Sequence, residues 1–226
     1  MLILAVDTTT SAGSMALLRD TDLLAELNVR SPLTHSETLL PAIDFLLRHH
    51  SLGIKDMDGF ALAVGPGSFT GIRIGLSTIK SFSYASRKPV APVSSLKALA
   101  FKLRFPKNRL IAPVIDAKKG EIYAALFESK REELAEVIPQ GVYTPDGFFS
   151  RLPSHRVVHF IGNGVDGYKE KIFHYFKDKA RIPRRSFYIG REIGLLGYEL
   201  LRRRQGRDVH QVEPLYFRKS QAEEKN

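Results

Sequence analysis

The sequence predicts an α/β protein of two lobes, each built on a mixed sheet. Two observations carry this prediction: short apolar runs alternate with amphipathic stretches, and the same order of elements starts again in the second half of the chain. With 226 residues, 43% hydrophobic and 26% charged, the composition is that of an ordinary globular protein with room for two small domains. A short basic segment around Pro106 has the character of a linker, so the lobes are expected over residues 1–104 and 105–226.

The first lobe begins with Leu2–Asp7, an apolar run that is too short for a helix and ends in a polar turn, as buried strands do. Thr34 and Glu37 have the spacing of a capping box, which predicts a helix starting at His35, and Ser68 is a suitable N-cap for the next helix. After the first strand we expect strands at 14–18, 23–29, 59–64 and 89–93, and helices at 34–49, 69–86 and 95–103.

The second lobe repeats this pattern. Leu110–Asp116 resembles Leu2–Asp7, and each half also contains a strand followed by a Gly-x-Gly turn, at Gly65–Gly67 and at Gly162–Gly164. A last helix over residues 190–205 is expected to pack back on the first lobe. The other elements expected here are strands at 123–127, 134–138 and 156–161, and helices from 144 and over 167–176.

Two similar lobes of this kind, facing each other, are the architecture of the two-lobed actin-like (ASKHA, ribonuclease H-like) fold of actin, Hsp70 and sugar kinases. In that fold the first turn of each lobe and the later Gly-rich turns line one nucleotide cleft, where backbone N–H groups meet phosphate and carboxylates hold hydrated Mg²⁺. An equally weighted alternative is that the glycines only make tight turns and the aspartates only cap loops. The residues assigned to the cleft are Asp7, Thr9, Gly65, Gly67, Asp116, Lys118, Gly120, Gly162 and Gly164.

Several classes of site are excluded. The chain has no cysteine, so disulfides, Cys-ligated zinc, iron–sulfur clusters and thiol nucleophiles are ruled out. His155 and His159 are spaced four apart, but in a strand they would lie ~13 Å apart, too far to share one ion, so no metal site is expected. No apolar run approaches the ~18 residues of a membrane span, and Asp7 ends the first run too early for a signal peptide. We therefore expect a cytoplasmic protein without membrane contact.

Particular motifs resemble the bacterial TsaB family, the non-catalytic partner in the synthesis of threonylcarbamoyladenosine on tRNA. The dense matches lie in the first lobe, at Asp7–Thr10, Thr34–Pro41 and Gly65–Gly75. The thinner matches lie at Asp116–Ala124, Gly162–Gly164 and Pro214–Arg218. The resemblance implies that the nucleotide cleft is vestigial, with no cofactor expected and ATP or ADP bound only at a subunit junction of a complex.

The resemblance also implies the loss of a catalytic metal. The family's catalytic paralogue, TsaD, has the same fold and transfers threonylcarbamoyl to an adenosine of the anticodon loop, and it holds a metal through a His-x-x-x-His pair. The corresponding positions here are Ser95 and Leu99, of which leucine cannot ligate a metal and serine is a poor lone ligand. No catalytic residue is therefore assigned to this chain.

Two helices of the first lobe are expected to form the partner face, because in TsaB the corresponding helices pair with TsaD or with a second TsaB. Gly71 and Gly75 are four apart in a helix, where each interior glycine costs roughly 1 kcal/mol relative to alanine, so something must approach the backbone closely. That neighbour is either a strand of the same lobe or a second chain, and the resemblance favours the second chain. The residues assigned to the partner face are Thr34, His35, Glu37, Leu39, Phe69, Gly71, Arg73, Gly75, Thr78 and Phe82.

The formal charge of +10 favours acidic partners such as nucleic acid. Candidates for weak RNA contact follow the last helix, where they are equally compatible with a solvated helix end: Arg202, Arg203, Arg204 and Arg207. The partners that the resemblance implies are a TsaD-like paralogue, a TsaE-like ATPase, a second copy of the chain when it is alone, and tRNA indirectly.

The function that the resemblance implies is therefore a scaffold and activator subunit of a tRNA-modifying complex. The main rival is a self-sufficient small-molecule kinase or ATPase of the actin-like fold, which would bind and turn over ATP·Mg²⁺ alone. A third hypothesis is an RNA-binding module that acts alone, with tight and steeply salt-dependent tRNA binding.

Overall fold

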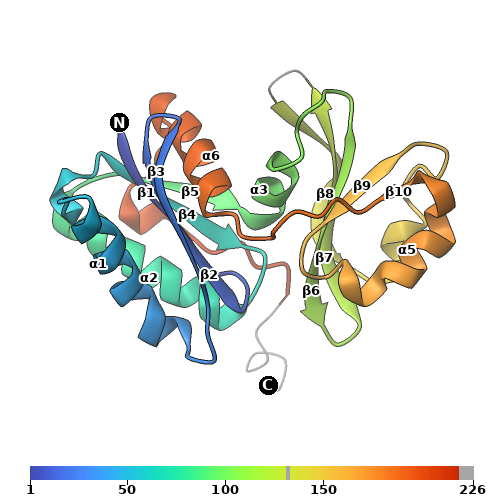
Figure 1. Ribbon diagram of the computed structural model, residues 1–226, viewed down its shortest axis with the longest axis horizontal. Coiled ribbons are helices and arrows are strands. Elements are labelled where there is room, and N and C mark those ends of the chain that lie inside the picture. The colour runs from blue at the N-terminus through green and yellow to red at the C-terminus, as the bar shows by residue number, and fades with distance from the viewer. Residues whose placement is uncertain (131–132, 219–226) are drawn as a thin grey trace. The chain divides into compact units, whose positions relative to one another are not determined.

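A computed structural model describes residues 1–130 and 133–218 of the chain, which divide into two compact units (Figure 1). The first unit comprises residues 1–95 and 188–216, and the second comprises residues 96–187 and the chain from residue 217. The first segment of the first unit ends at Ser95, whereas the lobe expected from the sequence ends at residue 104. The two boundaries differ because most of the short helix that begins at Ser95 belongs to the second unit. Residues 219–226 of the predicted second lobe lie outside the described residues.

The first unit contains a five-stranded mixed sheet in the order β3-β2-β1-β4-β5. β1 is central and entirely buried, because it pairs antiparallel with β2 and parallel with β4 and is covered on both faces. The bounds of the strands are β1 Leu2–Asp7, β2 Ala12–Arg19, β3 Asp22–Arg30, β4 Gly59–Gly65 and β5 Val90–Ser94.

Three long helices cover this sheet: α1 His35–His49, α2 Phe69–Ser86 and α6 Gly190–Arg202. α1 and α2 lie on one face and α6 lies on the other (Figure 1). α6 packs closely because Gly194 and Gly197 leave room for the side chains of Leu18 and Ala61. The last long helix of the chain thus packs on the first unit.

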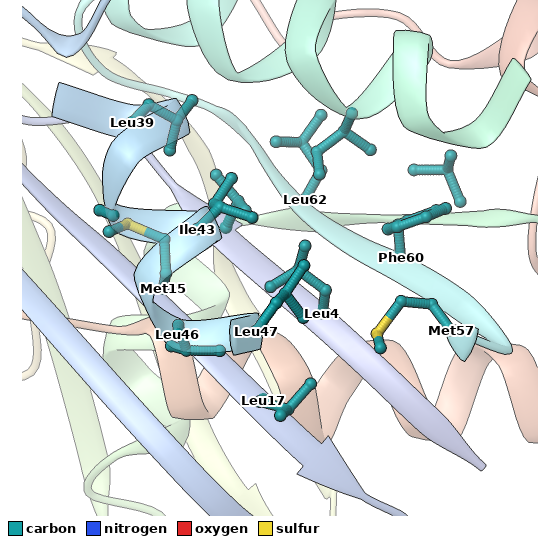
Figure 2. Packing of buried hydrophobic residues seen from close by; sticks show 14 of the residues in the cluster. Leu4, Met15, Leu17, Leu39, Ile43, Leu46, Leu47, Met57, Phe60 and Leu62 are labelled. Carbon is teal, nitrogen blue, oxygen red and sulfur yellow. The ribbon is translucent and has the colours of Figure 1, made fainter. Parts of the chain in front are cut away.

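The core of the first unit lies between the sheet and α1 with α2. Figure 2 shows Leu39, Ile43, Leu46 and Leu47 of α1 gathered with strand residues such as Leu4 in one cluster. These four α1 side chains follow the spacing of one helical face, so burial of that face holds α1 on the sheet.

The sheet of the second unit has the strand order β10-β9-β6-β7-β8. Read in the opposite direction, this order repeats that of the first sheet, with β6 in the place of β1. The internal repeat predicted from the sequence is therefore present in the topology. β10 has only two residues, a length at which a sequence carries no periodic pattern, and it was not predicted. The bounds are β6 Leu110–Lys118, β7 Glu121–Lys130, β8 Glu133–Tyr143, β9 Val158–Ile161, β10 Ala180–Arg181, α3 Ser95–Phe101, α4 Pro145–Phe149 and α5 Lys169–Phe176.

Short 3₁₀ turns complete the structure at Ile54–Asp56, Asp166–Tyr168, Lys177–Lys179 and Val209–Gln211. Within residues 1–130 and 133–218, no helix has both the length and the apolar character that crossing a bilayer requires.

Candidate functional site: the groove between α1 and α2

α1 and α2 border a groove of about 510 Å³ on the first unit, which we call the α1–α2 groove. Leu40 on its α1 side is 51% exposed, and Arg73 on its α2 side is also exposed. Apolar side chains beside a polar rim are typical of surfaces that bind another protein. The lining residues are His35, Ser36, Leu39, Leu40, Phe69, Thr70, Arg73, Ile74, Ser77 and Thr78.

The start of α1 is fixed by its own sequence. The Glu37 carboxylate accepts hydrogen bonds from the backbone N of Thr34 at 2.8 Å and from its hydroxyl at 2.7 Å. These hydrogen bonds lower the pKa of Glu37, so the carboxylate stays ionised beside the positive end of the helix dipole. The predicted start at His35 is confirmed, and the helix continues through Pro41.

His35 connects α1 to the turn that follows β1. Its Nε2 lies 2.7 Å from the carbonyl oxygen of Thr10. Its ring also lies close enough to the buried Asp7 for its charge to lower the pKa of that carboxyl group. One end of the groove is therefore attached to the Asp7–Thr10 turn.

The start of α2 is attached to the same turn. The Ser68 hydroxyl accepts a hydrogen bond from Gly71 N at 3.2 Å, as an N-cap does, and Ser68 N donates to the carbonyl oxygen of Thr9 at 2.7 Å. The buried Thr8 hydroxyl donates to the carbonyl oxygen of Gly71 at 2.7 Å. Both walls of the groove are thus held by hydrogen bonds to one turn, which fixes their separation.

Gly71 and Gly75 do not face outward, and their assignment to the partner face is wrong. Both are buried against β1's end: a Cβ at Gly71 would collide with Thr8 O, and a Cβ at Gly75 would collide with Thr8 Oγ1. The neighbour that approaches the helix backbone is therefore Thr8, directly after β1 of the same lobe, which agrees with the within-lobe alternative that the sequence left open.

Phe82 is likewise turned inward, since it is partly buried and lies with its ring centroid 6.2 Å from that of Phe60. Phe69, assigned to the partner face, lines the groove together with Thr78. The assigned set is thus divided: His35, Leu39, Phe69, Arg73 and Thr78 line the groove, Thr34 and Glu37 cap α1 outside it, and the other three residues face the core.

Several lining residues were not assigned from the sequence, and Leu40 is the clearest of them. The buried residues Leu39, Ile43 and Leu46 define the inner face of α1 and leave Leu40 about 100° away from Leu39. The helical period itself could therefore have identified it as outward-facing.

Phe69, Arg73 and Tyr216 form an aromatic and cationic cluster at one edge of the groove. The Phe69 and Tyr216 rings stack with centroids 4.8 Å apart, and the Arg73 guanidinium carbon lies 3.8 Å from the Phe69 centroid. Arg73 Nε also donates a hydrogen bond to the Tyr216 hydroxyl at 3.2 Å. A residue near the end of the chain therefore holds two of the lining side chains in place.

The cleft residues of the first unit surround the same turn. Asp7 is 1% exposed and its Oδ1 accepts from Thr9 N at 2.8 Å and from the Thr9 hydroxyl at 2.7 Å. Burial raises the pKa of Asp7, and the hydrogen bonds from Thr9 and the charge of His35 partly oppose that rise. Gly65 has a φ of +114° and Gly67 lies against Thr9 O, so both positions require glycine.

The second unit repeats this arrangement. Asp116 Oδ1 accepts from Lys118 N at 2.8 Å, and its Oδ2 pairs with Lys118 Nζ at 2.8 Å. Partial burial raises the pKa of Asp116, but the hydrogen bonds and the charge of Lys118 outweigh it, so the pKa lies below its ordinary value. Gly162 lies against Val114 O, and Gly164 lies against Asp116 N, while Gly120 occupies an open turn with a φ of +77°.

Each strand-end aspartate thus accepts a hydrogen bond from the backbone two residues later. In the first unit Gly67 packs against the turn that follows the aspartate, and in the second unit Gly162 and Gly164 pack against the strand that carries it. The aspartates and glycines of each unit serve local geometry, as the loop-capping alternative proposed, and nucleotide binding by the two sets stays a prediction.

Ser95 and Leu99 are both buried. The Ser95 hydroxyl donates to the carbonyl oxygen of Pro66 at 2.5 Å, so it serves the turn between β4 and α2. Among the described residues, no three His, Asp or Glu side chains lie together in a way that could hold a metal ion.

The arginines at the end of α6 are exposed. Arg202 pairs with Glu199 at 2.8 Å, and Arg203 lies 3.7 Å from the same carboxylate. The backbone of Arg207 pairs with that of Val90. Contact between RNA and the four arginines Arg202, Arg203, Arg204 and Arg207 stays a prediction.

Comparison with known proteins identifies the family. Residues 31–225 match the family model described as TsaD, tRNA N6-adenosine threonylcarbamoyltransferase. The tRNA threonylcarbamoyladenosine biosynthesis protein TsaB of Bacillus subtilis is 33% identical over 228 aligned residues, which span 100% of this chain and 97% of that protein.

Solved structures agree with this result. An uncharacterized protein from Pseudomonas aeruginosa, described as similar to the peptidase YEAZ, superposes with a TM-score of 0.83 at 27% identity and covers 96% of this chain and 99% of that one. The activator of 2-hydroxyisocaproyl-CoA dehydratase from Clostridium difficile, solved with ADPNP, shares the fold alone, with a TM-score of 0.54 at 11% identity over 96% of this chain and 100% of that one. The predicted actin-like fold is therefore confirmed. Because the match to the Bacillus subtilis protein runs through the whole sequence, the chain belongs to the TsaB family of tRNA threonylcarbamoyladenosine biosynthesis proteins.

Proposed function

We propose that this chain is the non-catalytic partner of a TsaD-like threonylcarbamoyltransferase and pairs with that enzyme through the α1–α2 groove. When the enzyme is absent, the same groove pairs two copies of the chain. When the enzyme is present, a TsaE-like ATPase joins the complex. The substrate of the assembled enzyme is tRNA.

The observation that carries this proposal is the groove itself. Leu40 is exposed on α1 beside Phe69 and Arg73 of α2, and the Asp7–Thr10 turn holds both helices in place. A preformed groove with an apolar side chain and an arginine suits a protein partner, because little conformational entropy is lost on binding.

A supporting observation concerns the place where the catalytic paralogue carries its histidine pair. The family resemblance assigns those positions to Ser95 and Leu99 in this chain, and the Ser95 hydroxyl already donates a hydrogen bond to Pro66 O. The side chains present there serve packing and turn geometry, which favours a supporting role over a catalytic one.

The test uses two matched substitutions on α1. Leu40→Asp places a charge in the groove, whereas Phe45→Asp places the same charge at a side chain that is 63% exposed and outside the groove. We expect Leu40→Asp to weaken binding to the TsaD-like paralogue of the same organism at least tenfold by isothermal titration calorimetry, because a desolvated carboxylate in an apolar contact is costly.

The control Phe45→Asp is expected to bind within twofold of the unmodified chain, and both variants should keep its thermal unfolding midpoint. Equal binding by Leu40→Asp and the unmodified chain would contradict the proposed surface. Threonylcarbamoylation of tRNA by the isolated chain would contradict the proposed role.

A further inference from the structure

The positive charge of the chain is concentrated in its second unit. The first unit has 13 Lys and Arg against 12 Asp and Glu, a formal charge of +1. The second unit has 21 Lys and Arg against 12 Asp and Glu, a formal charge of +9, and so accounts for nearly all of the total of +10. An asymmetry of this kind between two similar units indicates a polyanionic partner for one of them.

Many acidic side chains of the second unit already have a cationic partner. Glu128 pairs with Arg156 at 3.0 Å, and Asp146 pairs with Lys171 at 2.5 Å. By contrast, Lys169, Arg184 and Arg185 are exposed and have no acidic partner, since they make no ion pair with any residue in the described part of the chain. These three are therefore available to an external anion.

The same three cations line one pocket of about 370 Å³ in the second unit. The pocket lies beside the end of β9 and the Gly162 turn, and α5 and the segment of residues 182–187 form its other walls. Phe173 on α5 also lines it and is 42% exposed, while Asp166 contributes the single carboxylate. Cations and an accessible aromatic ring therefore share one concave surface.

We propose that this pocket binds the phosphodiester backbone of RNA, with Lys169, Arg184 and Arg185 at the phosphates and Phe173 as a stacking surface for one unpaired base. Guanidinium groups form paired hydrogen bonds with phosphate oxygens, and an exposed ring stacks on any base regardless of sequence. The inference goes beyond the proposed function, which gives the second unit no ligand, and it does not depend on the partner at the α1–α2 groove.

An extended polyanion fits the observations better than a free nucleotide does. The excess charge is spread over a whole unit and is not confined to the pocket, so one triphosphate would neutralise only part of it. The arginines at the end of α6 are a weaker candidate for the same role, because Arg202 and Arg203 share Glu199 and belong to the nearly neutral unit.

The experiment measures binding of a fluorescently labelled, unmodified tRNA transcript to the full chain by anisotropy across a series of salt concentrations. The double variant Arg184→Gln/Arg185→Gln is compared with Arg202→Gln/Arg203→Gln, which removes the same charge from the first unit. We expect the first pair to weaken binding about tenfold or more and to reduce the salt slope by about one to two units. We expect the second pair to stay within about twofold of the unmodified chain.

Phe173→Ala adds a readout that charge alone does not give. We expect a loss of about tenfold for a transcript with an unpaired loop and a smaller loss for a fully duplex RNA of equal length. An equal loss from both arginine pairs would overturn the proposal, because binding would then follow net charge and not the pocket. It would also be overturned if ATP or inorganic phosphate bound the pocket and tRNA did not.

Discussion

The Phe69 and Tyr216 rings stack at a centroid distance of 4.8 Å, although the two residues come from the two separate chain segments that make up the first unit. The Tyr216 hydroxyl accepts a hydrogen bond from Arg73, so one side chain holds two residues that line the α1–α2 groove. The segment that ends in Tyr216 is itself attached to the sheet, because Leu215 N donates to Val64 O at 2.7 Å. The lining of the groove therefore depends on the C-terminal part of the unit.

Tyr216→Ala removes this support. We expect the free energy of unfolding to fall by about 1 kcal/mol, the usual value of an aromatic pair with one hydrogen bond. Binding to the TsaD-like paralogue should weaken several-fold, because Phe69 and Arg73 lose their fixed orientation. Calorimetry measures the binding and chemical denaturation measures the stability. Tyr84→Ala is the control, since Tyr84 lies on α2 outside the groove and is 74% exposed. Unchanged binding by Tyr216→Ala would show that the cluster does not shape the groove.

Gly75→Ala tests how closely α2 approaches the end of β1. In an exposed helix this change is stabilising by up to about 1 kcal/mol, through helix propensity. Here the added methyl group collides with Thr8 Oγ1, and the overpacking penalty of about 1–3 kcal/mol outweighs the propensity gain. We therefore expect net destabilisation by urea denaturation, with Ser77→Ala on the exposed side of α2 as a nearly neutral control. A Gly75→Ala variant that is more stable than the unmodified chain would contradict the close contact between Gly75 and Thr8.

Asp7→Asn tests the buried carboxyl group. The pKa of Asp7 is raised by burial, so the folded state favours the protonated form more than the unfolded state does. The contribution of this group to stability is therefore full below its ordinary pKa and is lost as the pH rises through the raised value. An amide keeps an acceptor for Thr9 without a buried charge, and we expect the variant to be more stable at neutral pH by on the order of 1 kcal/mol.

The advantage of Asp7→Asn should shrink as the pH falls towards 4, and thermal unfolding at several pH values measures it. The exposed Asp22→Asn is the control and should show no such dependence. A variant that is less stable than the unmodified chain at neutral pH would mean that the ionised carboxylate has a stabilising role, such as holding a cation.

The helix boundaries were predictable because they are encoded locally. Thr34 and Glu37 mark the start of α1, and Ser68 marks the start of α2, through hydrogen bonds between residues three apart. The side of α2 that faces outward was not predictable in the same way. Gly71 and Gly75 contribute nothing to an apolar periodicity, so only the position of Thr8, more than 60 residues earlier, decides which way they face.

The remaining part of the site could not be predicted because it depends on contacts between distant segments. Tyr216 reaches Arg73 across 143 residues of sequence, and no local pattern announces that pairing. The unequal charge of the two units was present in the sequence, and the unit boundaries give it its full size of +1 against +9.

The close fit of Gly71 and Gly75 on Thr8 has an evolutionary consequence. A larger residue at Gly71 or Gly75, or a side chain of another size at Thr8, would lift or lower one wall of the groove relative to the other. Preference among partners can then diverge within such a lineage while every outward-facing side chain stays the same.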